Sequence, residues 1–159
     1  MSQLTIGMGA MAVSSDPEDV LITYALGSCV AVIVHDPVRK VAGMLHFMLP
    51  ISAQSRSKAE ENPAMFADTG VPLLFESMYE KGSHKRDLVV RLAGGAKVGV
   101  DSAMFDIGRR NCVAVRKMLW TAGVPIAAED VGGSNARTAR IVVATGVTSI
   151  RSRGQELEL

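Results

Sequence analysis

Residues 23–46 read TYALGSCVAVIVHDPVRKVAGMLH, and this stretch decides both the predicted fold and the candidate chemistry. Gly27 and Ser28 form a turn signal directly in front of Cys29, between two apolar runs that are typical of β-strands. His46 ends the strand that follows. A thiol on a tight turn with an imidazole one hairpin away is the sequence outline of a cysteine nucleophile and its base.

The apolar runs on either side of this turn predict three consecutive strands. Residues 20–24 (VLITY) are β-branched and apolar, and residues 29–34 (CVAVIV) form the continuous apolar run that is typical of a strand buried on both faces. Residues 41–48 return as a third strand, which Pro50 stops. We expect the turn between the last two strands to be exposed and its His35 to be solvated.

Periodicity and turn signals predict the remaining elements. In chain order we expect an edge strand over residues 4–13, a polar surface loop over 51–63, a helix over 66–81, a strand over 87–93, a helix over 107–122, a strand over 126–131, and a hairpin formed by 140–144 and 147–151. This order indicates an α/β protein of the α+β type with much antiparallel pairing, and not a repeating βαβ series. We expect one domain over residues 1–159, with a frayed tail from about residue 152.

The two predicted helices have identifiable limits. In the first, apolar residues recur at helical spacing, at Val71, Leu74, Phe75 and Met78. Asp68 or Thr69 is the expected N-cap of this helix. Pro72 is tolerable only in its first turn. Asp106 is the expected cap of the second helix.

Composition bounds the class of protein. With 159 residues, 48% of them hydrophobic, the chain is long enough for one domain with a substantial core. A formal net charge of +1 and a single Trp give no general case for nucleic-acid binding. No apolar run approaches the ~20 residues of a membrane span, and no secretory signal is visible. Two cysteines without such a signal do not suggest a disulfide scaffold, so we expect a cytoplasmic protein with no membrane insertion.

From the residues alone, each member of the candidate site has an ordinary alternative. Cys29 is either a nucleophile exposed by its turn or a small buried hydrophobic residue. His46 is the best candidate base, but a histidine beside Phe47 and Met48 is equally consistent with a satisfied core residue. Thr23 would orient the imidazole as a third member, although a β-branched strand residue is the simpler interpretation.

Other candidate sites are weaker. Cys112 falls on the apolar face of the second helix and is expected to be a core residue. Two cysteines and three scattered histidines lack the paired spacing of metal ligands, so no metal is expected. Residues 94–97 (GGAK) imitate a phosphate loop without its spacing, and we expect no nucleotide there. The loop over residues 51–63 is either a lid beside the reactive centre or an ordinary solvated loop.

Five motifs, in order along the chain, resemble those of the CheD family, the chemoreceptor glutamine deamidases of bacterial and archaeal chemotaxis. They are LGSCV at residues 26–30, GMLHFMLP at 43–50, GGA at 94–96, IGRRN at 107–111 and AEDVGG at 128–133. Each block alone is weak, but five in register over nearly the whole length make the resemblance specific.

The resemblance implies a cysteine hydrolase with a Cys-His-Thr triad, whose roles fall on Cys29, His46 and Thr23. It implies deamidation of receptor glutamines, with hydrolysis of glutamate methyl esters as related chemistry and no cofactor. Backbone N–H groups around Gly27 and Ser28 are candidate oxyanion donors. The implied fold is a β-sandwich core flanked by helices, similar to the catalytic domain of the cytotoxic necrotizing factor toxins.

The resemblance also implies partners. The cytoplasmic region of chemotaxis receptors is the implied protein substrate, and a CheC-type phosphatase is a second implied partner. The alternative function is a non-catalytic docking module that binds receptors or such a phosphatase. Rapid alkylation of a triad thiol would separate the enzyme from the docking module.

Overall fold

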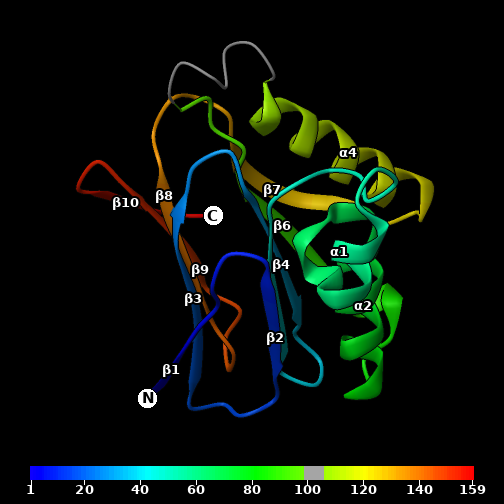
Figure 1. Ribbon diagram of the computed structural model, residues 1–159. Helices are drawn as coiled ribbons and strands as arrows, with labels where there is room; N and C mark the ends of the chain where they lie inside the picture. Colours follow the sequence, from blue (N-terminus) through cyan, green and yellow to red (C-terminus); the bar gives the residue numbers. More distant parts are fainter. Residues whose placement is uncertain (99–105) are drawn as a thin grey trace.

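A computed structural model describes residues 1–98 and 106–159, and within them ten strands form two five-stranded sheets. Figure 1 shows the two sheets as neighbouring layers, with the helices gathered outside the second sheet. The predicted mixed α/β class is confirmed. In the described residues the helices cover one outer face of the sheet pair, and none covers the outer face of the first sheet.

The first sheet has the strand order β1-β3-β8-β9-β10. Its strands are β1 (Ser2–Thr5), β3 (Asp19–Leu26), β8 (Arg137–Val142), β9 (Thr148–Ser152) and β10 (Gln155–Glu158). β1 runs parallel to β3, and the other neighbours are antiparallel. Within the tail that was expected to be frayed, Gln155 to Glu158 pair with β9 and form an edge strand of this sheet.

The second sheet has the order β2-β5-β4-β6-β7. Its strands are β2 (Ala10–Ser14), β5 (Val41–Phe47), β4 (Val30–Asp36), β6 (Val89–Gly94) and β7 (Ile126–Val131). Every residue of β4 and β5 is buried, as the continuous apolar run in β4 predicts. β4 lies between β5 and β6, with one face toward the first sheet and the other toward the helices.

The predicted edge strand over residues 4–13 is two strands in two different sheets. β1 pairs with β3 in the first sheet and β2 pairs with β5 in the second. Between them Gly9 has a φ of 71°, a left-handed conformation that glycine adopts without steric cost, and its N–H donates to the carbonyl of His46. The chain thus crosses from one sheet to the other beside His46.

Three helices and two 3₁₀ turns are found in residues 1–98 and 106–159. They are α1 (Arg56–Glu61), η1 (Pro63–Met65), α2 (Ala67–Glu80), η2 (Lys85–Asp87) and α4 (Ile107–Thr121). α1 lies inside the segment that was expected to be a loop. The predicted apolar stripe of α2 is confirmed, since Val71, Leu74, Phe75 and Met78 are all buried.

The ends of the long helices differ from the expected caps. Phe66 is the N-cap of α2, in place of Asp68 or Thr69, and Pro72 lies beyond the first turn, on the exposed side. Because Phe66 has no side-chain acceptor, packing and not capping fixes this helix start. Asp106 is the N-cap of α4 as expected, but its side chain makes no capping hydrogen bond.

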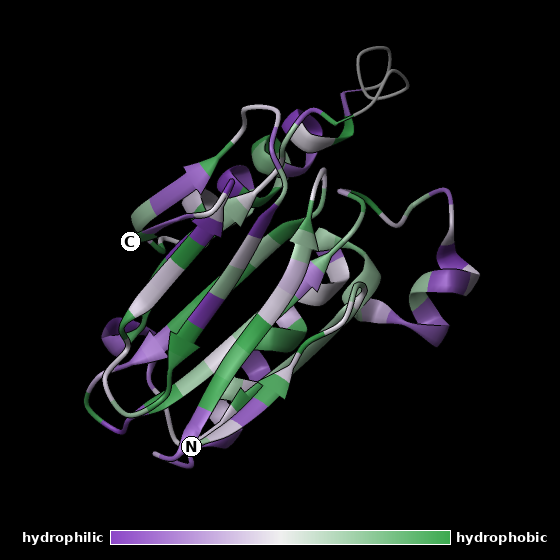
Figure 2. Cartoon of the chain, turned by 90° about the vertical axis from the view of Figure 1, so that its left-hand side faces the viewer, coloured by the Kyte–Doolittle hydropathy of each residue, from purple (hydrophilic) through white to green (hydrophobic). Residues whose placement is uncertain are grey.

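Two hydrophobic clusters hold these layers together. One fills the space between the sheets and includes Leu21, Ile33, Met44, Ile141 and Ile150. The other lies between the second sheet and the helices and includes Val32, Phe47, Leu74, Leu92 and Leu119. Figure 2 shows hydrophobic residues concentrated along the strands, with hydrophilic residues in the loops and in α1.

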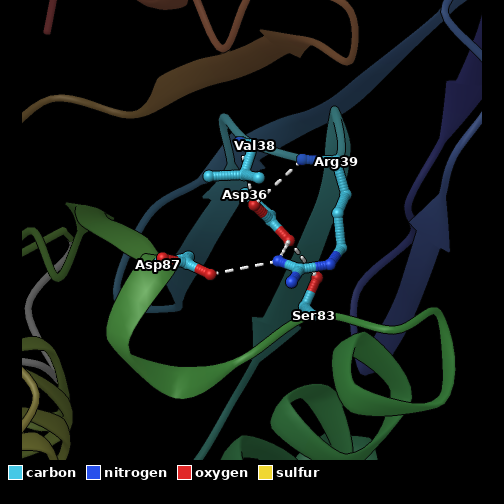
Figure 3. Close-up of polar contacts among 5 residues, drawn as sticks. All are labelled: Asp36, Val38, Arg39, Ser83 and Asp87. Atoms are coloured by element: carbon cyan, nitrogen blue, oxygen red, sulfur yellow. Dashed lines mark hydrogen bonds and ion pairs between the residues drawn. The ribbon is translucent and has the colours of Figure 1, made fainter.

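A buried carboxylate fixes the hairpin between β4 and β5. Asp36, fully buried, accepts hydrogen bonds from the backbone N–H groups of Val38 and Arg39, from Ser83 Oγ at 2.7 Å and from Arg39 Nη1 at 3.1 Å. Arg39 Nη1 also contacts Asp87 at 3.1 Å (Figure 3). Burial by itself would raise the pKa of Asp36, but the hydrogen bonds from Ser83, Arg39 and Val38 outweigh it and hold the pKa below 3.8.

His46 lies in the same ladder as this hairpin. Asp36 pairs with Val41 at the turn, and the same ladder pairs Ala31 with His46 one pair before its other end. The expectation that His35 is solvated is wrong: its side chain is buried, and its Nε2 lies 2.9 Å from the carbonyl oxygen of Val143.

Candidate active site

Cys29 lies on the turn between β3 and β4, as its sequence position predicts. The turn follows an irregularity in β3, where the pairing with β8 shifts between Thr23 and Leu26. Ala25 has a φ of 57° there, a left-handed conformation that is uncommon for a residue other than glycine. A bulge of this kind increases the local twist and redirects side chains, which is why bulges recur beside active sites.

Glycines bring a second loop against this turn. The N–H of Gly95 donates to the carbonyl of Cys29, and the N–H of Ala96 donates to the carbonyl of Gly27, both at 2.8 Å. A Cβ on Gly94 would lie closer than 3.0 Å to the Cys29 carbonyl oxygen. The GGAK segment therefore supports the cysteine turn, and this close backbone approach requires glycine at position 94.

His46 faces the space between the two sheets. Along β5, Ala42 and Met44 belong to the cluster between the sheets, and His46 continues that alternation. Thr23 stands in the same relation to Leu21 on β3. The two polar side chains thus meet from opposite sheets, in an interior where both are at most 1% exposed.

The hydroxyl of Thr23 connects His46 to the backbone. Thr23 Oγ1 donates to the carbonyl of Ile6 at 2.6 Å and lies 2.7 Å from His46 Nδ1. A hydroxyl has one hydrogen, and Ile6 takes it, so Thr23 accepts a hydrogen bond from Nδ1–H. The neutral imidazole then carries its lone pair on Nε2, which is buried and has no protein partner among the described residues.

Cys29 belongs to the same cluster between the sheets and is 8% exposed. The β4–β5 ladder pairs Val30 with Phe47, so Cys29 stands one residue beyond its last pair, where β5 ends. Thr23, Cys29 and His46 therefore approach the same end of the space between the sheets. Burial raises the pKa of the Cys29 thiol and lowers the pKa of His46, which favours a neutral thiol and a neutral imidazole in the resting protein.

Comparisons with known proteins show the family of this chain. The family described as "CheD chemotactic sensory transduction" matches residues 48–152. The chain is 45% identical to a probable chemoreceptor glutamine deamidase CheD of Solibacter usitatus, over 100% of this chain and 94% of that protein. It is 47% identical to a probable chemoreceptor glutamine deamidase CheD 2 of Anaeromyxobacter dehalogenans, over 98% of each. The chain belongs to the CheD family.

Among solved structures, the Bacillus licheniformis hypothetical protein YfiH superposes with a TM-score of 0.45 at 16% identity, over 78% of this chain and 49% of that one. The matches to the two CheD relatives cover 100% and 98% of this chain.

The other candidate residues take ordinary places in this CheD chain. Cys112 is buried on α4, as expected, and burial raises the pKa of its thiol. His84 is exposed. In the part of the chain that the structure describes, no group of three or more His, Cys, Asp or Glu side chains is placed to hold a metal ion. None of the described helices is long and apolar enough to cross a membrane.

A cleft of about 440 Å³ opens directly beyond the end of β5. Its lining includes Leu49, Ile51, Gln54, Phe66 and Arg110. Part of the segment predicted as a lid or solvated loop lines this cleft, and residues 56–61 form α1.

One polar contact of the CheD site was not predicted as such. Asn111 Nδ2 donates to the carbonyl of Ser28 at 2.9 Å and to the carbonyl of Met48 at 3.0 Å. The available signal was an uncharged polar residue next to Cys112 on the buried face of a helix, which a buried amide occupies only when it is hydrogen-bonded.

Proposed function

We propose that this chain hydrolyses the side-chain amide of glutamines in chemotaxis receptors, with Cys29 as nucleophile, His46 as base and Thr23 as the residue that orients His46. The observation that carries the proposal is the Thr23–His46 hydrogen bond, which leaves Nε2 free at the end of the sheets where the Cys29 turn begins. The two CheD relatives are described as probable chemoreceptor glutamine deamidases, which supports the same activity.

The first step uses the neutral pair that burial favours. His46 Nε2 accepts the Cys29 proton while the sulfur attacks the side-chain carbonyl carbon of the glutamine. The imidazolium that forms is held through its Nδ1–H on Thr23, whose hydroxyl is in turn fixed by Ile6. A hydroxyl stabilises this cation less than a carboxylate would, so Thr23 acts mainly by fixing the tautomer.

Oxyanion stabilisation would come from the turn itself. No carbonyl of the described residues accepts a hydrogen bond from the backbone N–H of Ser28 or Cys29. The carbonyls of Gly27 and Cys29, by contrast, are tied to the glycine loop, which holds the turn in place. Fixed N–H groups aimed at the developing negative charge are the usual source of such stabilisation.

The second half of the reaction reverses the roles. The His46 imidazolium protonates the leaving ammonia, and a thioester between Cys29 and the glutamyl side chain remains. Water, deprotonated by His46, attacks the thioester, releases glutamate and restores the thiol. A glutamate methyl ester would pass through the same tetrahedral intermediate with methanol as leaving group. No step requires a cofactor.

The partners follow from this substrate. The glutamines lie on the cytoplasmic region of the receptors, so we place the enzyme in the cytoplasm, as one CheD-like domain over residues 1–159. A CheC-type phosphatase is a further proposed partner. We also infer a fold relationship to the catalytic domain of the cytotoxic necrotizing factor toxins, on the basis of the sandwich with helices on one side.

Peptide mass spectrometry of a receptor cytoplasmic fragment tests the activity. Incubation with the protein should convert specific glutamines to glutamate, and conversion should vanish in both Cys29→Ala and His46→Ala. Cys112→Ala is the matched control, since it removes the other buried thiol and should retain conversion. Receptor binding without conversion by the unaltered protein would instead favour the docking module.

A further inference from the structure

One side chain joins the two segments that carry the candidate nucleophile and base. Asn111 is fully buried on α4, and its Nδ2 donates to the carbonyls of Ser28 and Met48. Ser28 directly precedes Cys29, and Met48 closely follows His46. The amide therefore contacts the backbone on both sides of the proposed reaction centre from a third element.

The sheet does not supply this connection. The β4–β5 ladder has its last pair at Val30 and Phe47, so the cysteine turn extends beyond it. The N–H groups of Met48 and Leu49 are taken by the carbonyl of Met65, which draws this part of the chain toward η1. Without a ladder between the turn and the segment after β5, their spacing depends on contacts from elsewhere.

The helix that carries Asn111, α4, packs against the glycine loop that supports the cysteine turn. A Cβ on Gly108 would lie closer than 3.0 Å to the carbonyl oxygens of Gly95 and Ala96. These two residues donate the hydrogen bonds to Cys29 and Gly27. The start of α4 and the glycine loop thus pack as one unit, and movement of Asn111 relative to Cys29 is restricted.

We propose that Asn111 is a positioning residue that sets the spacing of Cys29 and His46; this inference rests on the function proposed above. Its primary amide has two hydrogens, and the two carbonyls consume both. Asn111 therefore has no donor left for an oxyanion and acts through the two backbone segments. The orientation of the amide is fixed as well, because only the nitrogen can donate to two carbonyls.

The test measures the reactivity of Cys29 in a Cys112→Ala background, where it is the only thiol. The alkylation rate with iodoacetamide is followed against pH in the parent, His46→Ala, Asn111→Leu and Val115→Ala. Leu matches the shape of Asn without its donors. Val115→Ala is the control, since it removes buried packing from the same helix and leaves both hydrogen bonds of Asn111 in place. Conversion of receptor glutamines is measured in parallel.

We expect Asn111→Leu to lose the His46-dependent part of the alkylation rate and to lower conversion on the order of 10²-fold, as for misplacement of reacting groups by ~1 Å. In Asn111→Ser the single hydroxyl hydrogen can bond one carbonyl, so its alkylation rate and conversion should lie between those of the parent and Asn111→Leu. If Asn111→Leu does not fold, Asn111→Ser still tests the proposal. Equal profiles for the Asn111 variants and Val115→Ala would overturn the positioning role. Equal profiles for parent and His46→Ala would instead overturn the nucleophile–base pair, and the role of Asn111 with it.

Discussion

Thr23 Oγ1 lies 2.7 Å from His46 Nδ1, and its own hydrogen is committed to the carbonyl of Ile6 at 2.6 Å. The direction of the Thr23–His46 hydrogen bond is therefore determined by a third residue on a different segment. Because the Ile6 carbonyl takes the single hydroxyl hydrogen of Thr23, the hydroxyl cannot donate to Nδ1. Thr23 therefore holds the neutral imidazole as the tautomer with its hydrogen on Nδ1.

Thr23→Val tests this relationship, because it keeps the shape and removes the hydroxyl. We expect receptor deamidation to fall roughly 10-fold or more, short of the loss of about 10²- to 10⁴-fold when proton transfer itself is removed. The nitrogen NMR shifts of His46 should change from one Nδ1–H tautomer to a mixture. Thr23→Ser should retain both activity and tautomer.

Stability provides the control for that substitution. Thr23→Val leaves the buried Ile6 carbonyl without its donor, at a cost of about 1–3 kcal/mol. Thr148→Val is matched to it, since Thr148 is equally buried and donates to the carbonyl of Gly146 away from the site. Both variants should be destabilised in urea unfolding, but only Thr23→Val should change the tautomer. A tautomer shift in both would contradict the assigned role.

The pH dependence of deamidation follows from burial of the pair. Proton transfer requires neutral His46, so the rate rises with pH as His46 loses its proton. Because burial lowers the pKa of His46, the acid limb of kcat/KM should have its midpoint below 6.5. Burial raises the pKa of Cys29, so the alkaline limb should lie above 9.0. An acid midpoint above 6.5 would contradict a neutral His46 whose pKa is lowered by burial.

The same shift affects folding. The folded pKa of His46 is lowered, so below 6.5 the unfolded chain binds the proton more readily than the folded chain does. The stability associated with neutral His46 is therefore present above 6.5 and is lost as pH falls below it. His46→Gln should flatten this part of the dependence of the unfolding free energy on pH.

The pairing of Thr23 with His46 could be predicted from the sequence, because side chains alternate between the two faces of each strand. Leu21 and Thr23 share one face of β3, and Met44 and His46 share one face of β5, so a sandwich of these strands brings the polar pair together. The turn at Cys29 could also be predicted, because it separates two apolar runs.

Contacts between distant segments were not accessible in this way. The division of residues 4–13 between two sheets depends on one left-handed residue, Gly9. The burial of His35 depends on its contact with the carbonyl of Val143, which directly follows β8 of the first sheet. Likewise, periodicity marks Asn111 only as a residue near the buried face of a helix. Its two carbonyl partners are set by how α4 packs on the sheet, which no local pattern contains.

Gly95→Ala tests the contact between the glycine loop and α4. Gly95 has a φ of 63°, and an added Cβ would lie closer than 3.0 Å to Cys112 Sγ. We expect a loss of about 1–2 kcal/mol from the left-handed backbone and a further loss of about 1–3 kcal/mol from overpacking. Urea unfolding measures both together. The Cys29 carbonyl loses a well-placed donor, so deamidation should fall as well.

Two variants separate these contributions. Gly154→Ala has the same left-handed strain, with a φ of 75°, but meets nothing within 4 Å, so it should show the backbone term alone. Adding Cys112→Ala to Gly95→Ala removes the sulfur and should restore part of the stability. If Gly95→Ala and Gly154→Ala were equally destabilised, the close packing of the loop on α4 would be refuted.

Asp36→Asn tests the far end of the β4–β5 hairpin. Asp36 accepts from Ser83 and Arg39 while fully buried, so loss of its charge should destabilise the protein by about 1.5–3 kcal/mol at neutral pH. The folded pKa of Asp36 lies below 3.8, so its contribution is present above 3.8 and is lost as pH falls through the folded value. The difference in unfolding free energy between parent and variant should therefore shrink on acidification. Since the site lies at the opposite end of the ladder, conversion per folded molecule should be unchanged. A loss of activity in folded Asp36→Asn would show instead that the hairpin register, and with it the position of His46, depends on this carboxylate.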